Sequence, residues 1–261
     1  MKDQTVLFHS TIFGPVHSRR LGVSLGVNLM PNDGKICSFD CLYCEAGYNA
    51  QGVGTTGLPT LEQVSADLQA TLQKMHSAGE RLDVITFSGN GEPTLHPRFP
   101  EIIDEVIRLR DAYFAEAKIS VLSNSTRIFD DRVADALDRV DNNILKLDSA
   151  IESTMRLIDR PNDPNFTVER VVERLRRFEG TAIIQTMMLR GEHEGLSVDN
   201  TTPEEIDALI EAYLTIRPRE VMLYSIDRST PEEQLIKVER PELEQIAARI
   251  SAAGVPIQPF S

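Results

Sequence analysis

Short runs of β-branched and other apolar residues alternate along this chain with longer stretches in which apolar residues recur every three or four positions. The apolar runs occupy 23–30, 83–89, 118–124, 143–149, 181–188 and 220–226. Each run is rich in Val, Ile or Leu, which is typical of strands buried on both faces of a parallel sheet. The pattern predicts six strands.

The stretches between the runs predict amphipathic helices with recognisable ends. Thr60 and Gln63 form a capping-box pattern at the start of a helix that stops at Gly79. Thr202 and Glu205 mark the start of another helix. Further apolar faces of helical period occupy 99–114, 166–180 and 241–254.

Strands that alternate with helices predict a parallel sheet and an α/β fold. Six βα units fit this length better than the eight of a closed barrel. We therefore expect one domain over 1–261, an incomplete (β/α)6 barrel with parallel strands, in which residues 1–21 form an extension that leads into the first strand. A doubly wound open sheet is the alternative.

Polar residues gather where the predicted strands end. The segments that follow the strands read PNDGKICSFDCLYC, SGNGEPTLHP, SNST, DSA, QTMMLRGEHE and SIDRST. In parallel α/β barrels the active site lies at the carboxyl ends of the strands. The sequence thus predicts one functional site at that end of the barrel, with the GEHEG segment (191–195) as an acidic loop beside it.

Composition narrows the class of protein. The chain is 41% hydrophobic and 26% charged, which is ordinary for a globular protein. No apolar run approaches 18 residues, so we expect no membrane span. The first residues lack the apolar core of a signal peptide, which predicts a cytoplasmic protein. The formal net charge of −13 argues against a large nucleic-acid footprint, and no DNA partner is expected.

All three cysteines of the chain, Cys37, Cys41 and Cys44, lie within eight positions. An odd, tightly clustered set in a reducing compartment points to metal rather than to disulfides. Thiolates select zinc, Cu(I) or iron–sulfur clusters. A zinc site would need a fourth ligand such as His17 or His96. A four-iron cluster held by three thiolates would keep one iron open for catalysis.

The CxxxCxxC spacing with an aromatic residue before the last cysteine, directly after a first strand, resembles the radical S-adenosylmethionine (SAM) enzymes. The resemblance implies that the three cysteines bind a [4Fe-4S] cluster whose open iron holds SAM. It further implies reductive cleavage of SAM to a 5′-deoxyadenosyl radical, which removes hydrogen from a substrate. An electron donor such as flavodoxin or ferredoxin is then expected as a partner.

The same resemblance assigns further residues to SAM. Tyr43 matches the aromatic position near the adenine, and the GNGEP segment resembles the family's glycine-glycine-glutamate motif. Glycine permits close backbone approach and a carboxylate accepts from an ammonium group. The SAM contacts implied in this way are Tyr43, Gly89, Gly91, Glu92, Ser123, Asn124, Asp148, Met187 and Ile226.

The segment FGPVHSRRLGVSLGVNL (13–29), together with LIDRP (157–161), is similar to the tRNA wyosine-base synthetase branch of these enzymes. Arg19 and Arg20 in this segment would reach a phosphate or carboxylate. The archaeal and eukaryotic members carry extra cysteines for a second cluster, which this chain lacks. The substrate, whether a small molecule, RNA or protein, stays open.

Two lysines are candidates for chemistry on a substrate. Lys35 lies beside the cysteines, and strand alternation puts Lys146 and Asp148 on one face of a strand. We take Lys146 and Asp148 as candidate catalytic residues, with a structural ion pair as the other interpretation. A radical SAM activase of a partner enzyme and a zinc-stabilised binding module remain as alternative functions.

Overall fold

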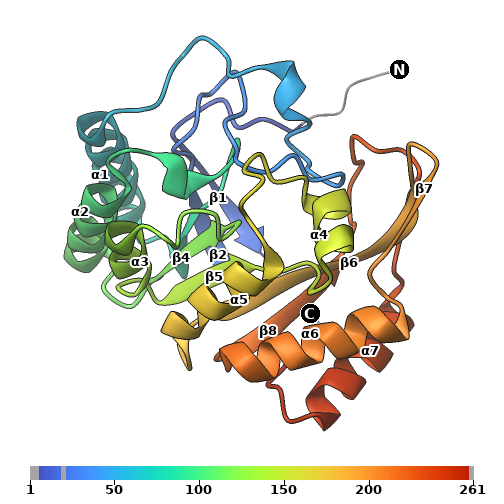
Figure 1. Cartoon of the computed structure of the whole chain (residues 1–261). Helices are drawn as coiled ribbons and strands as arrows, with labels where there is room; N and C mark the ends of the chain where they lie inside the picture. The colour runs from blue at the N-terminus through green and yellow to red at the C-terminus, as the bar shows by residue number, and fades with distance from the viewer. Residues whose placement is uncertain (1–5, 19–21, 259–261) are drawn as a thin grey trace.

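A computed structural model describes residues 6–18 and 22–258 and contains the predicted parallel sheet (Figure 1). The six strands pair in the order β2, β3, β4, β5, β6 and β8, all parallel. Their bounds are β2 Gly22–Val27, β3 Val84–Phe87, β4 Lys118–Ser123, β5 Asn142–Lys146, β6 Ile183–His193 and β8 Glu220–Ser225. Among the described strands β8 pairs with β6 and does not reach β2, as expected of an incomplete barrel.

Three antiparallel strands extend this sheet and were not predicted. They are β1 Ile12–Ser18, β7 Leu196–Asp199 and β9 Leu235–Lys237. β1 forms a hairpin with β2, whereas β7 and β9 both pair with the far end of β6. The prediction of a loop at 191–195 was therefore wrong, because β6 continues to His193 and Glu194 and Gly195 form the turn of a β-hairpin.

The predicted helices are present, with two short ones in addition. Their bounds are α1 Leu61–Ser77, α2 Phe99–Tyr113, α3 Asp131–Leu137, α4 Glu152–Asp159, α5 Val168–Leu175, α6 Pro203–Ile216 and α7 Arg240–Ala252, with single 3-10 turns η1 Asn49–Gln51, η2 Pro93–Leu95 and η3 Arg176–Phe178. The capping box at the start of α1 is confirmed, because Thr60 Oγ1 accepts from the Gln63 amide and Gln63 Oε1 accepts from the Thr60 amide.

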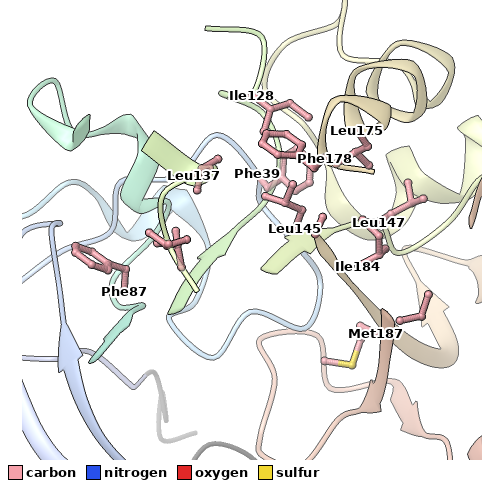
Figure 2. Packing of buried hydrophobic residues seen from close by; sticks show 14 of the residues in the cluster. Phe39, Phe87, Ile128, Leu137, Leu145, Leu147, Leu175, Phe178, Ile184 and Met187 are labelled. Atoms are coloured by element: carbon pink, nitrogen blue, oxygen red, sulfur yellow. The ribbon is translucent and has the colours of Figure 1, made fainter. Parts of the chain in front are cut away.

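The main hydrophobic core lies between the outer face of the sheet and the helices that cover it (Figure 1). Outward side chains of the strands, such as Leu145 and Ile184, belong to this core (Figure 2). The inward side chains Ile144, Ile183 and Met222 form a small separate cluster. The alternative of a doubly wound sheet, with helices on both faces, was therefore wrong.

The loops at the carboxyl ends of the parallel strands carry the polar segments that the sequence singled out. Phe39, from the long loop after β2, lies among core side chains that include Ile128 and Phe178 (Figure 2). This anchor holds the loop over the open end of the barrel. No helix in the described part of the chain is long and apolar enough to cross a bilayer.

Candidate functional site

The three cysteines lie in the loop between β2 and α1, which is held by an internal hydrogen bond and by buried apolar side chains. The Cys44 amide donates to the Cys41 carbonyl oxygen at 3.2 Å, so the last two cysteines share one tight turn. Phe39 and Leu42 alternate with the thiols and are buried at 2% and 0% exposure. Apolar residues thus fix the loop to the core while the cysteines remain at its surface or just beneath it.

A second set of main-chain contacts ties the cysteine loop to the end of α4. The Asp40 amide donates to the Asp159 carbonyl oxygen, and the Leu42 amide donates to the Ile158 carbonyl oxygen, each at 3.0 Å. The Cys41 thiol lies 3.6 Å from the Asp159 carboxylate. The LIDRP segment therefore packs directly against the middle cysteine.

The loop after β3 is joined to the cysteine loop by a parallel β-bridge between Ile36 and Gly91. The Ile36 amide donates to the Asn90 carbonyl oxygen and the Glu92 amide donates to the Ile36 carbonyl oxygen. A Cβ atom on Gly91 would lie 1.8 Å from that carbonyl oxygen, so only glycine permits this approach. The two motifs that the sequence singled out form one continuous backbone unit.

Glu92 directly follows the bridge residue Gly91, and its side chain is buried, with 2% exposed. Its carboxylate accepts the Thr94 amide at 3.1 Å and the Asn124 amide at 2.6 Å. Burial raises the pKa of the Glu92 carboxyl, although the hydrogen bonds from Asn124, Thr94 and Ser123 act in the opposite direction. The predicted residues Glu92, Ser123 and Asn124 are therefore in direct contact.

Asn124 also connects the end of β4 to the first cysteine. Its side-chain amide nitrogen, Nδ2, lies 3.6 Å from the Cys37 sulfur and donates to Ser38 Oγ at 2.9 Å. Ser38 Oγ in turn lies 2.6 Å from Thr126 Oγ1. The SNST segment thus holds the first cysteine by side-chain hydrogen bonds.

Tyr43, Lys146 and Asp148 meet on the inner side of the barrel. The Tyr43 hydroxyl donates to the Asp148 carboxylate and accepts from the Lys146 ammonium. Lys146 Nζ lies 3.2 Å from Asp148 Oδ2, and the other Asp148 oxygen accepts the Met187 amide at 2.8 Å. Tyr224 completes this polar wall through a hydrogen bond with Tyr43.

Burial dominates the electrostatics of the cysteine loop. It raises the pKa of Cys37 to about 11 and that of Cys41 well above its ordinary value. Lys35 is 2% exposed, and its ammonium donates to the Gly47 carbonyl oxygen at 2.6 Å. Burial acts to lower the pKa of Lys35, but the charges of Cys44, Cys37 and Cys41 outweigh it and raise that pKa. A buried cation thus lies near all three thiols.

The structure also places the remaining residues that the sequence assigned to SAM. A Cβ atom on Gly89 would lie 2.3 Å from Asn28 Oδ1, so Gly89 allows the β3 loop to turn closely past β2. Met187 is 6% exposed and Ile226 is partly buried, and both pack with the main core. Arg19 and Arg20 lie outside the described residues.

The two histidines considered as zinc ligands lie elsewhere. Both ring nitrogens of His96 are engaged, Nε2 with the Pro59 carbonyl oxygen and Nδ1 with the Arg98 amide. His17, in β1, interacts with Asp83 at the opposite end of the sheet. Within residues 6–18 and 22–258 no three His, Cys, Asp or Glu side chains are grouped as ligands of a single ion. With both ring nitrogens of His96 engaged and His17 at the far end of the sheet, neither histidine is available to complete a Cys3His site.

Sequence reasoning missed Asn200 and Tyr224. Asn200 donates to the carbonyl oxygens of Asp148 and Met187 and so links the end of β5 to the middle of β6. No local pattern marks Asn200, because its bond to Asp148 spans 52 residues and its bonds to Met187 and Leu189 form only when the chain folds back after β7. Tyr224 was detectable in principle, since it shares the period-two inward face of β8 with Met222.

An incomplete α/β barrel whose carboxyl end carries a loop of three cysteines, bridged to a glycine-glutamate loop, defines a class of cofactor-dependent enzymes. A sequence profile of this class, the Radical SAM superfamily, matches residues 32–195. The chain belongs to the radical SAM superfamily. It is accordingly an enzyme that uses a [4Fe-4S] cluster and SAM.

Curated relatives match nearly the whole chain. It is 28% identical over 248 residues to a Brachyspira hyodysenteriae protein named GTPase Obg, and this match covers 94% of the chain and 34% of that protein. It is 29% identical to a UPF0026 protein of Synechocystis, with 95% of each covered. The chain thus spans about a third of the Brachyspira protein and almost all of the Synechocystis one.

Solved structures share the fold. A radical SAM methyltransferase from Sphaerobacter thermophilus aligns with a TM-score of 0.66 at 15% identity, over 90% of this chain and 65% of that one. TYW1 with a bound lysine-pyruvate adduct aligns with a TM-score of 0.57 at 17% identity, over 88% of this chain and 73% of that one. At these identities the likeness is one of fold.

Proposed function

We propose that this chain binds one [4Fe-4S] cluster through Cys37, Cys41 and Cys44 and cleaves SAM reductively to 5′-deoxyadenosine by way of a radical that takes hydrogen from a substrate. The observation that carries the proposal is the β-bridge between Ile36 and Gly91. It sets the cysteine loop and the buried Glu92 carboxylate side by side. The Glu92 carboxylate would accept from the ammonium group of a methionine held at the cluster.

The three thiols fit such a cluster. Asn124 offers an N–H group to the Cys37 sulfur, and the Lys35 ammonium compensates negative charge near all three ligands. The cluster would supply the electron that breaks the carbon–sulfur bond of SAM. The protein supplies the ligands, the counter-charge and a partly buried setting.

The polar wall of Tyr43, Lys146, Asp148 and Tyr224 is assigned to SAM and to the substrate next to it. The Lys146 ammonium is held by Tyr43 and Asp148. Burial acts to lower the pKa of Lys146, but the charges of Asp148, Tyr224, Cys41 and Asp159 together outweigh it and raise that pKa well above its ordinary value. A charged ammonium group that is held by two side chains is well suited to bind ribose or carboxylate oxygens and is a poor nucleophile. Lys146 therefore binds and orients, and Asp148 positions Tyr43.

For the substrate, we propose a nucleoside in tRNA. The support is the similarity of residues 13–29 and 157–161 to the wyosine-base branch, together with the shared fold of TYW1. The reaction differs from that branch in using no second cluster, since the three cysteines are all assigned to the first.

The test of SAM cleavage uses protein purified without oxygen, reconstituted with iron and sulfide and reduced. We expect 5′-deoxyadenosine from the wild type and none from Cys41→Ala. Glu92→Gln should lose SAM affinity by roughly 10-fold or more, because one charge-assisted bond to the ammonium contributes about 1.5–3 kcal/mol. Glu101→Gln, which changes a carboxylate on the outer helix α2, is the matched control.

Colourless protein with stoichiometric zinc would overturn the proposal. The substrate is tested separately, by mass spectrometry of tRNA nucleosides from cells with and without the gene. One modified nucleoside should disappear and return on complementation. Identical nucleoside profiles would exclude tRNA, and transfer of the radical to a co-purified protein would then indicate an activase.

A further inference from the structure

The three cysteines of the loop are not held in the same way. Cys41 and Cys44 share a main-chain bond in one tight turn, whereas within residues 6–18 and 22–258 Cys37 takes part in no main-chain hydrogen bond. The Cys37 carbonyl oxygen instead accepts from two side chains, Asn49 Nδ2 and Asn162 Nδ2, each at 3.3 Å. Asparagine side chains therefore position the first cysteine of the loop.

Asn49 makes the more complete contact of the two. Its Nδ2 group also donates to the Phe39 carbonyl oxygen at 3.0 Å, so one amide bridges two carbonyl groups that lie two residues apart. The Asn49 Oδ1 atom is buried and has no partner in the described part of the chain, so the side chain serves as a donor alone. Asn162 is exposed, and water competes for its bond.

A short turn after the last cysteine brings Asn49 back against the loop. Gly47 has a positive φ of 78°, and its amide donates to the Cys44 carbonyl oxygen at 2.9 Å. Asn49 then begins η1, where its own amide donates to Asp40 Oδ1 at 2.6 Å. Asp40 belongs to the cysteine loop, so both the main chain and the side chain of Asn49 are bound to that loop.

The two carbonyl groups that Asn49 holds lie on either side, along the chain, of the Phe39 N–H group. Burial raises the pKa of the Cys37 thiol, and a hydrogen bond from the Phe39 amide to the Cys37 sulfur acts in the opposite direction. Hydrogen-bond donors that face a ligand sulfur favour the reduced, more negative state of an iron–sulfur cluster. The direction of the Phe39 N–H group therefore bears on the reduction potential.

We propose that Asn49 is a positioning residue for the cluster: it holds the turn from Cys37 to Phe39 so that the Phe39 N–H group stays directed at the Cys37 sulfur, and it thereby raises the reduction potential of the cluster. The inference rests on the proposed function. Asn49 acts through the main chain, because its side chain donates to carbonyl oxygens alone. A higher potential makes entry of the electron that cleaves SAM more favourable.

The test is a redox titration of cluster-loaded protein without SAM, followed by electron paramagnetic resonance. Asn49→Leu keeps the size of the side chain and removes the donor. At the midpoint potential of the wild type, the ratio of reduced to oxidised cluster in this variant should be at least about threefold lower, as expected for one weakened hydrogen bond. Asn49→Ala, which introduces no extra bulk, should change the ratio in the same direction.

Gln51→Leu is the matched control, because Gln51 is an exposed amide residue in the same 3-10 turn. Its ratio of reduced to oxidised cluster should equal that of the wild type. An equal fall in Gln51→Leu would overturn the proposal, since the potential would then respond to any change in this turn.

Urea unfolding of the metal-free proteins separates positioning from a purely structural role. A lower free energy of unfolding in both Asn49 variants, with the wild-type ratio of reduced to oxidised cluster, would overturn the proposal. Wild-type protein that binds zinc and no cluster would remove this inference together with the proposed function. If the ratio falls as expected but the wild type does not cleave SAM, the proposed function alone fails and the positioning role of Asn49 stands.

Discussion

Lys35 is a charged side chain at the centre of the site, and its ammonium is almost wholly removed from water. Its charge favours the reduced, more negative state of a cluster bound by the neighbouring cysteines. We therefore expect Lys35→Met to shift the cluster's reduction potential to more negative values by about 59 mV or more, one tenfold step for a one-electron couple. Redox titration followed by electron paramagnetic resonance measures this shift.

Lys74→Met is the matched control, because Lys74 is exposed on α1. The reduction potential of the cluster in Lys74→Met should equal that in the wild type. If Lys35→Met also kept the wild-type potential, the ammonium would serve only to hold the loop through its bond to Gly47.

His96 gives the molecule a predictable sensitivity to pH. Its Nδ1 accepts the Arg98 amide and its Nε2 donates to Pro59, so the folded protein requires the neutral ring, and burial lowers the pKa of His96. The unfolded chain then binds more protons as pH falls below about 6.5. Stability present above that pH is lost as pH falls through the lowered folded-state value.

The free energy of unfolding of the metal-free protein should thus decrease between about pH 8 and about pH 5.5. In His96→Gln, which keeps a side-chain amide but does not titrate, the decrease should be smaller. The other four histidines are common to both proteins. Parallel curves from urea unfolding at several pH values would contradict this role for His96.

Residues whose roles depend on local spacing were predictable, and those that depend on distant partners were not. The cysteines, Gly91 and Glu92 stand in short motifs at the ends of neighbouring strands, so local pattern and strand order suffice to place them together. Asn200 and the pairing of Lys146 with Tyr43 depend on contacts across more than 50 residues. No periodicity encodes such contacts, and only the folded sheet brings them together.

Gly91 belongs to the element that joins two loops, and its replacement should separate them. Gly91→Ala places a methyl group against the Ile36 carbonyl oxygen at a φ of +132°. We expect a loss of roughly 3 kcal/mol or more of stability together with loss of SAM binding, since backbone cannot move aside cheaply. Thermal unfolding and equilibrium dialysis with labelled SAM measure the two effects.

Gly57→Ala supplies the comparison for this substitution. Gly57 also has a positive φ, of +69°, but a methyl group there meets nothing within 4 Å. It should cost only about 1–2 kcal/mol of backbone strain and leave SAM binding intact. Equal effects of the two substitutions would show that strain, rather than the contact between the loops, explains Gly91.

At the scale of elements, the parallel strands were predictable because each carries its own apolar run. The antiparallel additions were not. β7 and β9 are short, mostly exposed strands that pair with the far end of β6, and each places a single apolar side chain, Val198 or Leu235, against the core. Their sequences are acidic or mixed, so hydrophobic patterning gives no signal, and tertiary pairing decides their structure.

The whole molecule should unfold as one unit. A single core cluster contains residues from Leu25 to Val255, and one sheet connects all nine strands. We expect urea unfolding of the metal-free protein to give coincident transitions by circular dichroism and by the fluorescence of its five tyrosines. Two separated transitions would contradict the prediction of one domain over 1–261.

The cysteine loop owes its shape to main-chain bonds with Asn90, Ile158 and Asp159 and to the buried ring of Phe39. These contacts involve protein atoms alone. Because these contacts do not use the thiols, we expect a preparation made in air to stay folded and monodisperse while its chemistry is silent. Good behaviour on a column says nothing about cofactor loading in this protein, and a library screen run on the bench would score it as inert.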